Sequence, residues 1–144
     1  GRCVKVAPKV RATFRFPVRV YYEDTDAAGV VYYANYLRFM ERTRTEWLGS
    51  LGFDLATFES GHGIAFVVHR VAIEYRLPAR LGERLDATLT LVELRRARMV
   101  ALQQVWRDEE MLTDALVTVA CIDRVTFRPA RIPLALHRKL ETFA

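Results

Sequence analysis

Residues 21–36 read Y-Y-E-D-T-D-A-A-G-V-V-Y-Y-A-N-Y, and the repeat pattern of the chain changes within this stretch. Before it, apolar residues alternate with other residues along 14–22, which predicts a strand with one buried face. Pro17 cannot donate to a ladder, so it favours an edge or the start of that strand. After Gly29, apolar residues follow helical spacing, which predicts an amphipathic helix of about four turns with Asn35 as its N-cap. The stretch is therefore a loop between two rigid elements, where chemistry is commonly placed.

The predicted helix has a wide aromatic side that should lie buried against a sheet. Its apolar positions are Tyr33, Tyr36, Leu37, Met40, Trp47, Leu48 and Leu51. Beyond it, the patterns predict a short helical turn over 54–63, four strands over 64–76, 84–94, 99–107 and 111–123, and a C-terminal helix from Pro133. Because the strands are joined mostly by short turns, we expect antiparallel neighbours. The expected fold class is α+β, with one long helix packed on a five-stranded antiparallel sheet.

Composition indicates one globular domain over residues 1–144, with residues 1–12 as a flexible extension. No apolar run approaches the roughly 18 residues of a membrane span. Two cysteines are too few for a disulfide framework, which favours the reducing cytoplasm, and Cys121 should be a small core residue. The net charge of +5 allows anionic partners. The chain lacks zinc-finger spacing and interleaved aromatic and basic residues, so nucleic-acid binding is a minor hypothesis.

The acidic residues of the opening stretch are the first candidates for chemistry. Asp26 stands a few residues before a helix N-terminus, where N–H groups and a positive dipole end can stabilise an oxyanion. A carboxylate there can act as a general base or as a nucleophile, although a turn or capping role fits the same position. For Asp24 and Glu23 we expect a turn cap or a surface salt bridge. A metal site is not expected, because no second cluster of oxygen ligands accompanies them.

The remaining candidates are aromatic residues and histidines. Tyr32, Tyr33 and Tyr36 either line a substrate tunnel or pack in the core. His69 lies in a predicted strand, where a packed or hydrogen-bonded role is expected rather than catalysis. Glu74 should be a charge on the sheet surface. No serine or cysteine elbow accompanies a histidine, which argues against a Ser-His-Asp type of enzyme.

The motif Y-x-D-T-D-x-x-G-x-x-Y-Y-x-x-Y continues directly into the helix L-R-F-M-E-R-T-R-T-E-W-L. Together with F-V-V-H-R-V-A-I-E-Y-R-L-P-A-R-L and the late R-P-A-R-I-P, it resembles the 4-hydroxybenzoyl-CoA thioesterase group of hotdog-fold proteins. Within that group it is most similar to the YbgC-like acyl-CoA thioesterases associated with the Tol-Pal system. The resemblance implies a sheet wrapped around the long helix. It also implies homodimers or homotetramers with joined sheets and active sites at the interface.

The resemblance also assigns roles to residues of the loop. Asp26 would be catalytic, the backbone N–H of Tyr33 would hold the thioester carbonyl, and Gly29 would let the chain approach that group. Val30 and Tyr36 are assigned to substrate binding. Many YbgC-like members carry histidine where this chain has Tyr33, so no side-chain acid or base role is transferred to that position.

Arg95, Arg96 and Arg98 form a basic turn between two predicted strands. Because arginine forks suit phosphates, these residues either bind the phosphates of coenzyme A or remain a solvated turn. The predicted function is hydrolysis of acyl-CoA to a free acid and CoA, in the cytoplasm and without metal or cofactor. One alternative is a hotdog enzyme of another reaction type, such as a dehydratase. Another is a non-catalytic module of the envelope system that binds acyl-CoA or acyl carrier protein.

Overall fold

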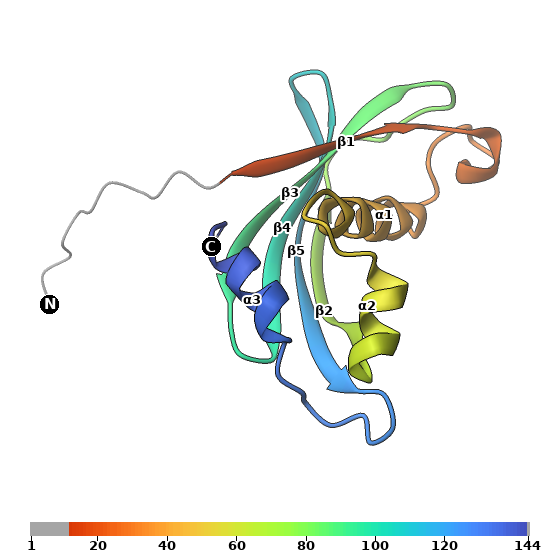
Figure 1. The fold of residues 1–144 in the computed structure, drawn as a ribbon. Coiled ribbons are helices and arrows are strands. Elements are labelled where there is room, and N and C mark those ends of the chain that lie inside the picture. The colour runs from red at the N-terminus through yellow and green to blue at the C-terminus, as the bar shows by residue number, and fades with distance from the viewer. Residues whose placement is uncertain (1–11, 144) are drawn as a thin grey trace, which may run out of the picture.

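The computed structural model describes residues 12–143, so all but the last residue of the predicted extension, with Cys3, lies outside the described part. Figure 1 shows a strongly curved sheet with a long helix in its hollow. The elements in chain order are β1 (Thr13–Arg19), a 3₁₀ turn η1 (Tyr22–Asp24), α1 (Asn35–Ser50), α2 (Leu55–His62), β2 (Ile64–Tyr75), β3 (Arg84–Leu94), β4 (Arg98–Arg107), β5 (Glu110–Asp123) and α3 (Leu134–Glu141).

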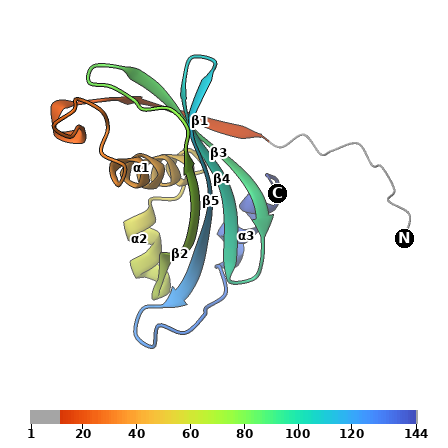
Figure 2. The same ribbon diagram turned by 180° about the vertical axis from the view of Figure 1, so that it is seen from behind.

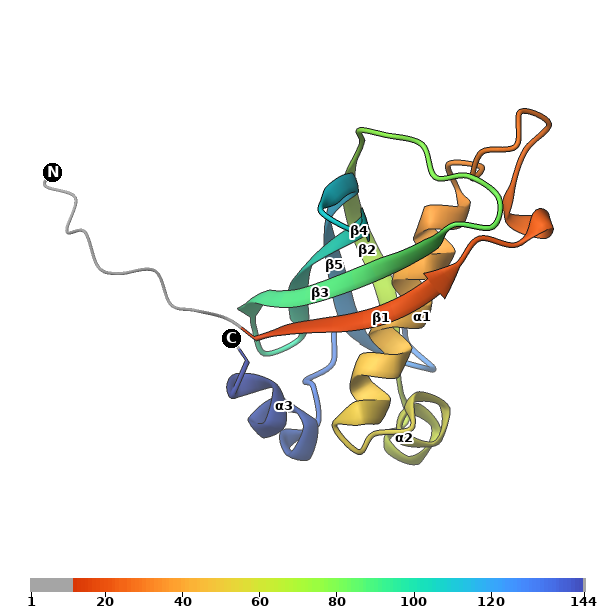
Figure 3. The same cartoon turned by 90° about the horizontal axis from the view of Figure 1, so that it is seen from above.

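The five strands form one sheet in the order β1-β3-β4-β5-β2, with every neighbouring pair antiparallel. This confirms the predicted α+β class and the sheet wrapped around one long helix. β1 is an edge strand, one of the two positions that Pro17 favours, and Figure 3 shows it beside β3. β2 forms the other edge, next to α2 (Figure 2).

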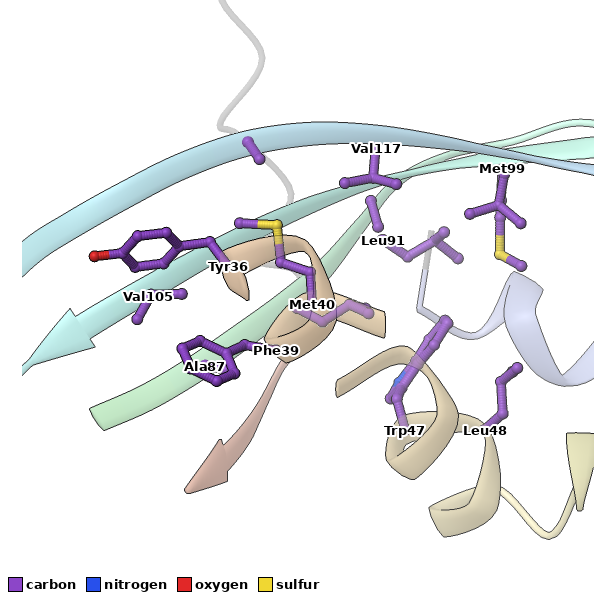
Figure 4. Packing of buried hydrophobic residues seen from close by; sticks show 14 of the residues in the cluster. Tyr36, Phe39, Met40, Trp47, Leu48, Ala87, Leu91, Met99, Val105 and Val117 are labelled. Carbon is purple, nitrogen blue, oxygen red and sulfur yellow. The ribbon is translucent and has the colours of Figure 1, made fainter. Parts of the chain in front are cut away.

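The core lies between α1 and the inner face of the sheet. Phe39, Met40 and Trp47 of α1 are buried there against inward-facing strand residues such as Leu91 and Val105 (Figure 4). Each such side chain removed from water contributes about 1.5–3 kcal/mol to folding. The alternation predicted for 84–94 is confirmed, because Leu85, Ala87, Leu89 and Leu91 are all buried.

The C-terminal half of the core is closed by α3 and the last strand. Leu136 and Leu140 are fully buried, and the ring of Phe143 meets Trp47 edge to face at 5.9 Å. Cys121 is buried, as predicted, and burial raises the pKa of its thiol to about 11. Pro133 precedes the first residue of α3 rather than occupying it.

Several predictions at the start of α1 are wrong in detail. Asn35 is the first helical residue, and its side chain donates to the Asp24 carbonyl oxygen at 2.9 Å instead of capping the helix. Phe39, absent from the predicted apolar side, is fully buried, whereas Leu37 is exposed. The end of β1 also differs from the prediction. The alternation over 14–22 predicts that Tyr22 continues the buried face of the strand, but the strand ends at Arg19 and the Tyr22 side chain is exposed.

The expectation that short turns join neighbouring strands fails for β2 and β3. Residues 76–83 link them, yet β2 pairs with β5 and β3 pairs with β1. The connection therefore crosses the open end of the curved sheet and passes over the start of α1. His69 also differs from prediction. It sits at a bulge between Val68 and Arg70 on the edge strand, and its side chain is exposed rather than packed.

Candidate active site

Asp26 lies at the tip of a tight turn within residues 20–34, which we call the site loop. The turn is closed by bonds from Asp26 N–H to the Val30 oxygen at 2.8 Å and from Gly29 N–H to the Asp26 oxygen at 3.0 Å. Gly29 has φ +78°, a left-handed conformation that glycine adopts without cost. The Asp26 side chain is exposed, and its Oδ1 accepts from Ala28 N–H at 2.8 Å. Within residues 12–143 its Oδ2 has no donor, so that oxygen is open to water or substrate.

Asp24 has a different task, although it lies two residues away. Its side chain is only 5% exposed, and Oδ2 accepts from Tyr21 N–H at 2.9 Å. Its carbonyl oxygen accepts from Tyr32 N–H at 3.0 Å and from the Asn35 side chain. The predicted capping role is confirmed for Asp24. Glu23 is exposed and forms no ion pair with any described residue.

Just before the first residue of α1, two backbone N–H groups donate to no acceptor in the described part of the chain. The first bonds of the turn run from Asn35 N–H to the Tyr32 oxygen and from Tyr36 N–H to the Tyr33 oxygen. This leaves the N–H groups of Tyr33 and Ala34 unused. They stand at the positive end of a 16-residue helix, where a developing negative charge is stabilised.

A cluster of tyrosines lies beside these N–H groups. The Tyr33 side chain is 60% exposed, and its ring meets that of Tyr75 edge to face at 6.2 Å. The Tyr75 hydroxyl donates to the Tyr33 carbonyl oxygen at 3.2 Å. Tyr36 is 3% exposed, so the core role holds for Tyr36, while Tyr32 and Tyr33 lie at the surface. Burial raises the pKa of both Tyr36 and Tyr75, which keeps the two phenols neutral near pH 7.

The tyrosine cluster borders a depression of about 250 Å³. It is lined by Val31, Tyr33, Tyr36, Tyr75, Arg76, Leu77 and Pro78. Two further cavities lie between α1 and β2, and we call them together the α1–β2 groove because Glu41, Arg44 and Val68 line both. The groove contains a cavity of about 200 Å³ beside Leu37 and Val71, then one of about 290 Å³ beside Leu48 and Phe66.

The crossing segment 76–83 holds the site loop in place. Ala79 is fully buried; its oxygen accepts from Val31 N–H at 2.8 Å, and its N–H donates to the Tyr36 hydroxyl oxygen at 3.1 Å. Leu81 N–H donates to the Gly29 oxygen at 3.3 Å. Figure 3 shows the two segments running side by side. Arg107 supports this arrangement, since it donates to the Pro78 oxygen and to both oxygens of Glu83.

The structure brings together five of the predicted site residues and separates the other three. Asp26, Gly29, Val30, Tyr33 and Tyr36 share the site loop and the start of α1. Arg95, Arg96 and Arg98 lie at the turn between β3 and β4, at the far end of the sheet. Ten residues of β4 separate that turn from Arg107, or about 33 Å at the usual rise of a strand. Within a single chain, the basic turn is therefore far from Asp26. Its predicted role in binding coenzyme A stays a prediction.

The sequence interpretation missed Tyr75 and Ala79. Their contacts with Tyr33, Val31 and Tyr36 join segments more than forty residues apart, and no local pattern reports such pairs. Glu74 is an exposed sheet-surface charge paired with Arg76 at 3.0 Å, as predicted. Among residues 12–143, no group of three or more potential metal ligands gathers. No helix in the same range is long and apolar enough to cross a membrane.

This fold and this loop define a class of protein. A family model described as "Thioesterase superfamily" matches residues 28–113, and the chain belongs to that superfamily. The acyl-CoA thioesterase YbgC of Haemophilus influenzae is 45% identical over 120 residues, which are 83% of this chain and 88% of the relative. The predicted family and hotdog fold are therefore confirmed.

Solved structures agree with this assignment. A probable thioesterase from Bartonella henselae has a TM-score of 0.81 and 38% identity, covering 85% of this chain and all of that chain. A 1,4-dihydroxy-2-naphthoyl-CoA thioesterase from Synechocystis has a TM-score of 0.83 and 27% identity, and the match covers 90% of this chain and 96% of that chain. The family match begins two residues after Asp26, so the case for Asp26 rests on the geometry of the site loop.

Proposed function

We propose that the protein hydrolyses acyl-CoA thioesters to a carboxylic acid and free CoA. The observation that carries this proposal is the pair of N–H groups at Tyr33 and Ala34 that have no acceptor within residues 12–143, on the same loop as the Asp26 carboxylate, in a chain 45% identical to an acyl-CoA thioesterase. The α1–β2 groove, with Val68, Val71 and Val117 in its wall, supplies an apolar surface for the acyl chain.

In the proposed reaction, the thioester oxygen accepts a hydrogen bond from Tyr33 N–H, which polarises the carbonyl carbon. Asp26 takes a proton from a water molecule as the water oxygen bonds to that carbon. In the tetrahedral intermediate, the negative charge lies on the former carbonyl oxygen, which faces the helix N-terminus. When it collapses, the carbon–sulfur bond breaks and CoA leaves as a thiolate that takes up a proton. The alternative, in which Asp26 attacks directly and forms a mixed anhydride, uses the same contacts.

We extend the proposal to a homodimer that completes the site. Within residues 12–143, edge strand β2 pairs with a strand on one side only, and Val67, Val68 and Tyr75 along it are exposed. On its open side, Phe66 N–H donates to Glu59 Oε2 at 2.6 Å. An exposed edge of this kind is a template for pairing with another chain. A second copy paired there would cover the open side of the α1–β2 groove. Two further points stay predictions: that dimers pair into tetramers, and that acyl carrier protein also delivers substrate.

We place the reaction in the cytoplasm, where a reduced Cys121 is expected, and we propose that it needs neither metal nor cofactor. Chelation with EDTA should therefore leave the rate unchanged. The Tol-Pal association stays a prediction based on resemblance.

The test is CoA release from a panel of aliphatic and aromatic acyl-CoAs by wild type and Asp26→Asn. The change removes the negative charge and keeps the shape, so kcat should fall by about 100-fold or more, the scale of acid–base catalysis. Glu23→Gln is the matched control, because Glu23 is an exposed acid on the same loop, and it should stay near wild type. Equal rates for wild type and Asp26→Asn would remove Asp26 from the mechanism. Binding of acyl-CoA without turnover by wild type would favour a binding module instead.

A further inference from the structure

Arg44 stands out in the α1–β2 groove because it is a half-buried cation that forms no ion pair with residues 12–143. Its side chain projects from α1 and lines both cavities of the groove, together with Glu41 and Val68. Within residues 12–143, no carboxylate oxygen lies within 4.0 Å of its guanidinium group. Burying a charge in apolar surroundings is costly unless it is paired, so the position calls for a partner.

The guanidinium is held by a neutral residue rather than by an acid. Arg44 Nη1 donates to Gln103 Oε1 at 2.9 Å, and Gln103 Nε2 donates to the Met40 carbonyl oxygen at 2.9 Å. Gln103 is 1% exposed, so both of its polar atoms are used within the core. A guanidinium has five N–H donors, and only one of them has an acceptor among the described residues. The remaining donors require water or a ligand.

The surroundings of Arg44 define what that ligand looks like. The larger cavity is lined mostly by apolar groups, including Trp47, Leu48, Leu55 and Phe66. The other charged group facing it is Glu41, three residues earlier on the same helix. Burial lowers the pKa of Arg44, and the Glu41 carboxylate opposes that change. An occupant must therefore be apolar along its length and carry an oxygen acceptor where it meets the guanidinium.

The position of Arg44 along the groove fits the far end of an acyl chain. It lies nine residues after Asn35, which is about 14 Å along the helix axis from the start of α1. A thioester carbonyl held at that start would send its chain toward Arg44. We propose that Arg44 is a specificity-determining residue that binds an oxygen-bearing end, above all a carboxylate, of an acyl chain in the α1–β2 groove. This inference rests on the proposed function, because the chain is taken to start at Tyr33.

The test compares plain acyl-CoAs, from hexanoyl to dodecanoyl, with the same chains ending in a carboxylate. Wild type should prefer the carboxylated chain in kcat/KM at one length, where the carboxylate reaches Arg44. Arg44→Met keeps the length of the side chain and removes the charge. It should lower kcat/KM for that substrate by about 10- to 100-fold, the scale of a charge-assisted hydrogen bond, with little effect on the plain chains. Arg44→Lys should restore part of the preference, since it keeps the charge but not the fork.

Arg42→Met is the matched control, because Arg42 is exposed on the same helix and lines neither cavity of the groove. It should leave the ratio between the two substrate series unchanged. An equal loss for plain and carboxylated chains in Arg44→Met would show a structural role and overturn the proposal. So would the absence of any preference in wild type.

A binding measurement separates this inference from the proposed function. Calorimetric titration with decanedioate and decanoate does not depend on turnover. Wild type should bind the dicarboxylate more tightly, and Arg44→Met should lose that difference. If wild type hydrolyses no thioester but shows this difference, the proposed function fails and the assignment of Arg44 stands. If hydrolysis proceeds and neither the binding nor the kinetic difference appears, the assignment of Arg44 is wrong.

Discussion

Asp24 and Asp26 show how the backbone gives two identical side chains different tasks. The Asp24 carboxylate is turned inward and accepts from the Tyr21 N–H, and its carbonyl oxygen bonds to the start of the helix. The Asp26 carboxylate stands outside the turn with one oxygen unused by the described residues. The motif alone does not separate them, because both are acids next to a helix. The separation comes from the 3₁₀ turn that ends at Asp24.

Cys121 provides a prediction about alkaline pH. Burial raises the pKa of its thiol from 9.0 to about 11, so the folded state keeps the thiol protonated while the unfolded state ionises. The contribution of the protonated Cys121 thiol to the free energy of unfolding is fully present below pH 9. It is lost as the pH rises from 9 through 11. The loss approaches about 2–3 kcal/mol in the free energy of unfolding.

The measurement is urea unfolding of wild type and Cys121→Ala at several pH values between 8 and about 11. The variant should be less stable at pH 8, because it leaves a small cavity. The difference in the free energy of unfolding between the two proteins should then become smaller toward alkaline pH, because only wild type carries the buried thiol. All other titratable groups are the same in both proteins, so their contributions cancel in the difference. A gap that stays constant with pH would contradict the prediction.

At the level of elements, periodicity predicts the strands and helices well but not their neighbours. The alternation of Leu85, Ala87, Leu89 and Leu91 reports a buried face directly, because strand side chains alternate between the two faces of a sheet, although Thr88 on the other face is buried as well. The partner of a strand depends on the path of the loop before it. Residues 76–83 are short enough to suggest a hairpin, yet they cross to the opposite side of the sheet. The same crossing brings Ala79 to Tyr36, and so that part of the site was also missed.

The turn of the site loop gives a prediction for this scale. Gly29 has φ +78° with open space where a Cβ would stand, so Gly29→Ala introduces backbone strain without a clash. We expect a loss of about 1 kcal/mol in stability and a larger relative loss of kcat, because the turn positions Asp26.

Gly49→Ala is the control for this prediction, and thermal unfolding with initial rates is the measurement. Gly49 lies within α1, has equally open space and no positive φ, so the same substitution should stabilise the protein by about 0.5–1 kcal/mol. Equal shifts of Tm for the two variants would show that the Gly29 conformation carries no strain.

At the scale of the whole molecule, the predicted coenzyme-binding role of the basic turn requires a second subunit. Within one chain, Arg95, Arg96 and Arg98 lie at the opposite end of the sheet from Asp26. Antiparallel pairing of two β2 edges would turn the second subunit end over end. Its basic turn would then lie at the same end of the joined sheet as the first subunit's site loop.

A mixed dimer tests this arrangement. One subunit carries Asp26→Asn, and the other carries alanine at the three arginines. If the arginines act across the interface, one of the two sites loses both functions and the other keeps both. The purified mixed dimer should then recover about half of the wild-type activity at low substrate, although each parent is weak. If the arginines act within their own chain, mixing gives no such recovery. If they do not act at all, the parent with three alanines is as active as wild type.

The bonds between the site loop and segment 76–83 have a consequence for folding kinetics. The site loop is synthesised early, but Val31 and Tyr36 are held by Ala79, more than forty residues further along the chain. The pairing of β2 with β5 also joins distant segments, because β3 and β4 lie between these two strands in the sequence. Contacts of such long sequence separation form slowly, since a large loop must close first. During refolding, the return of catalytic activity should therefore lag behind the return of the helical signal, and the delay should report the docking of this crossing segment.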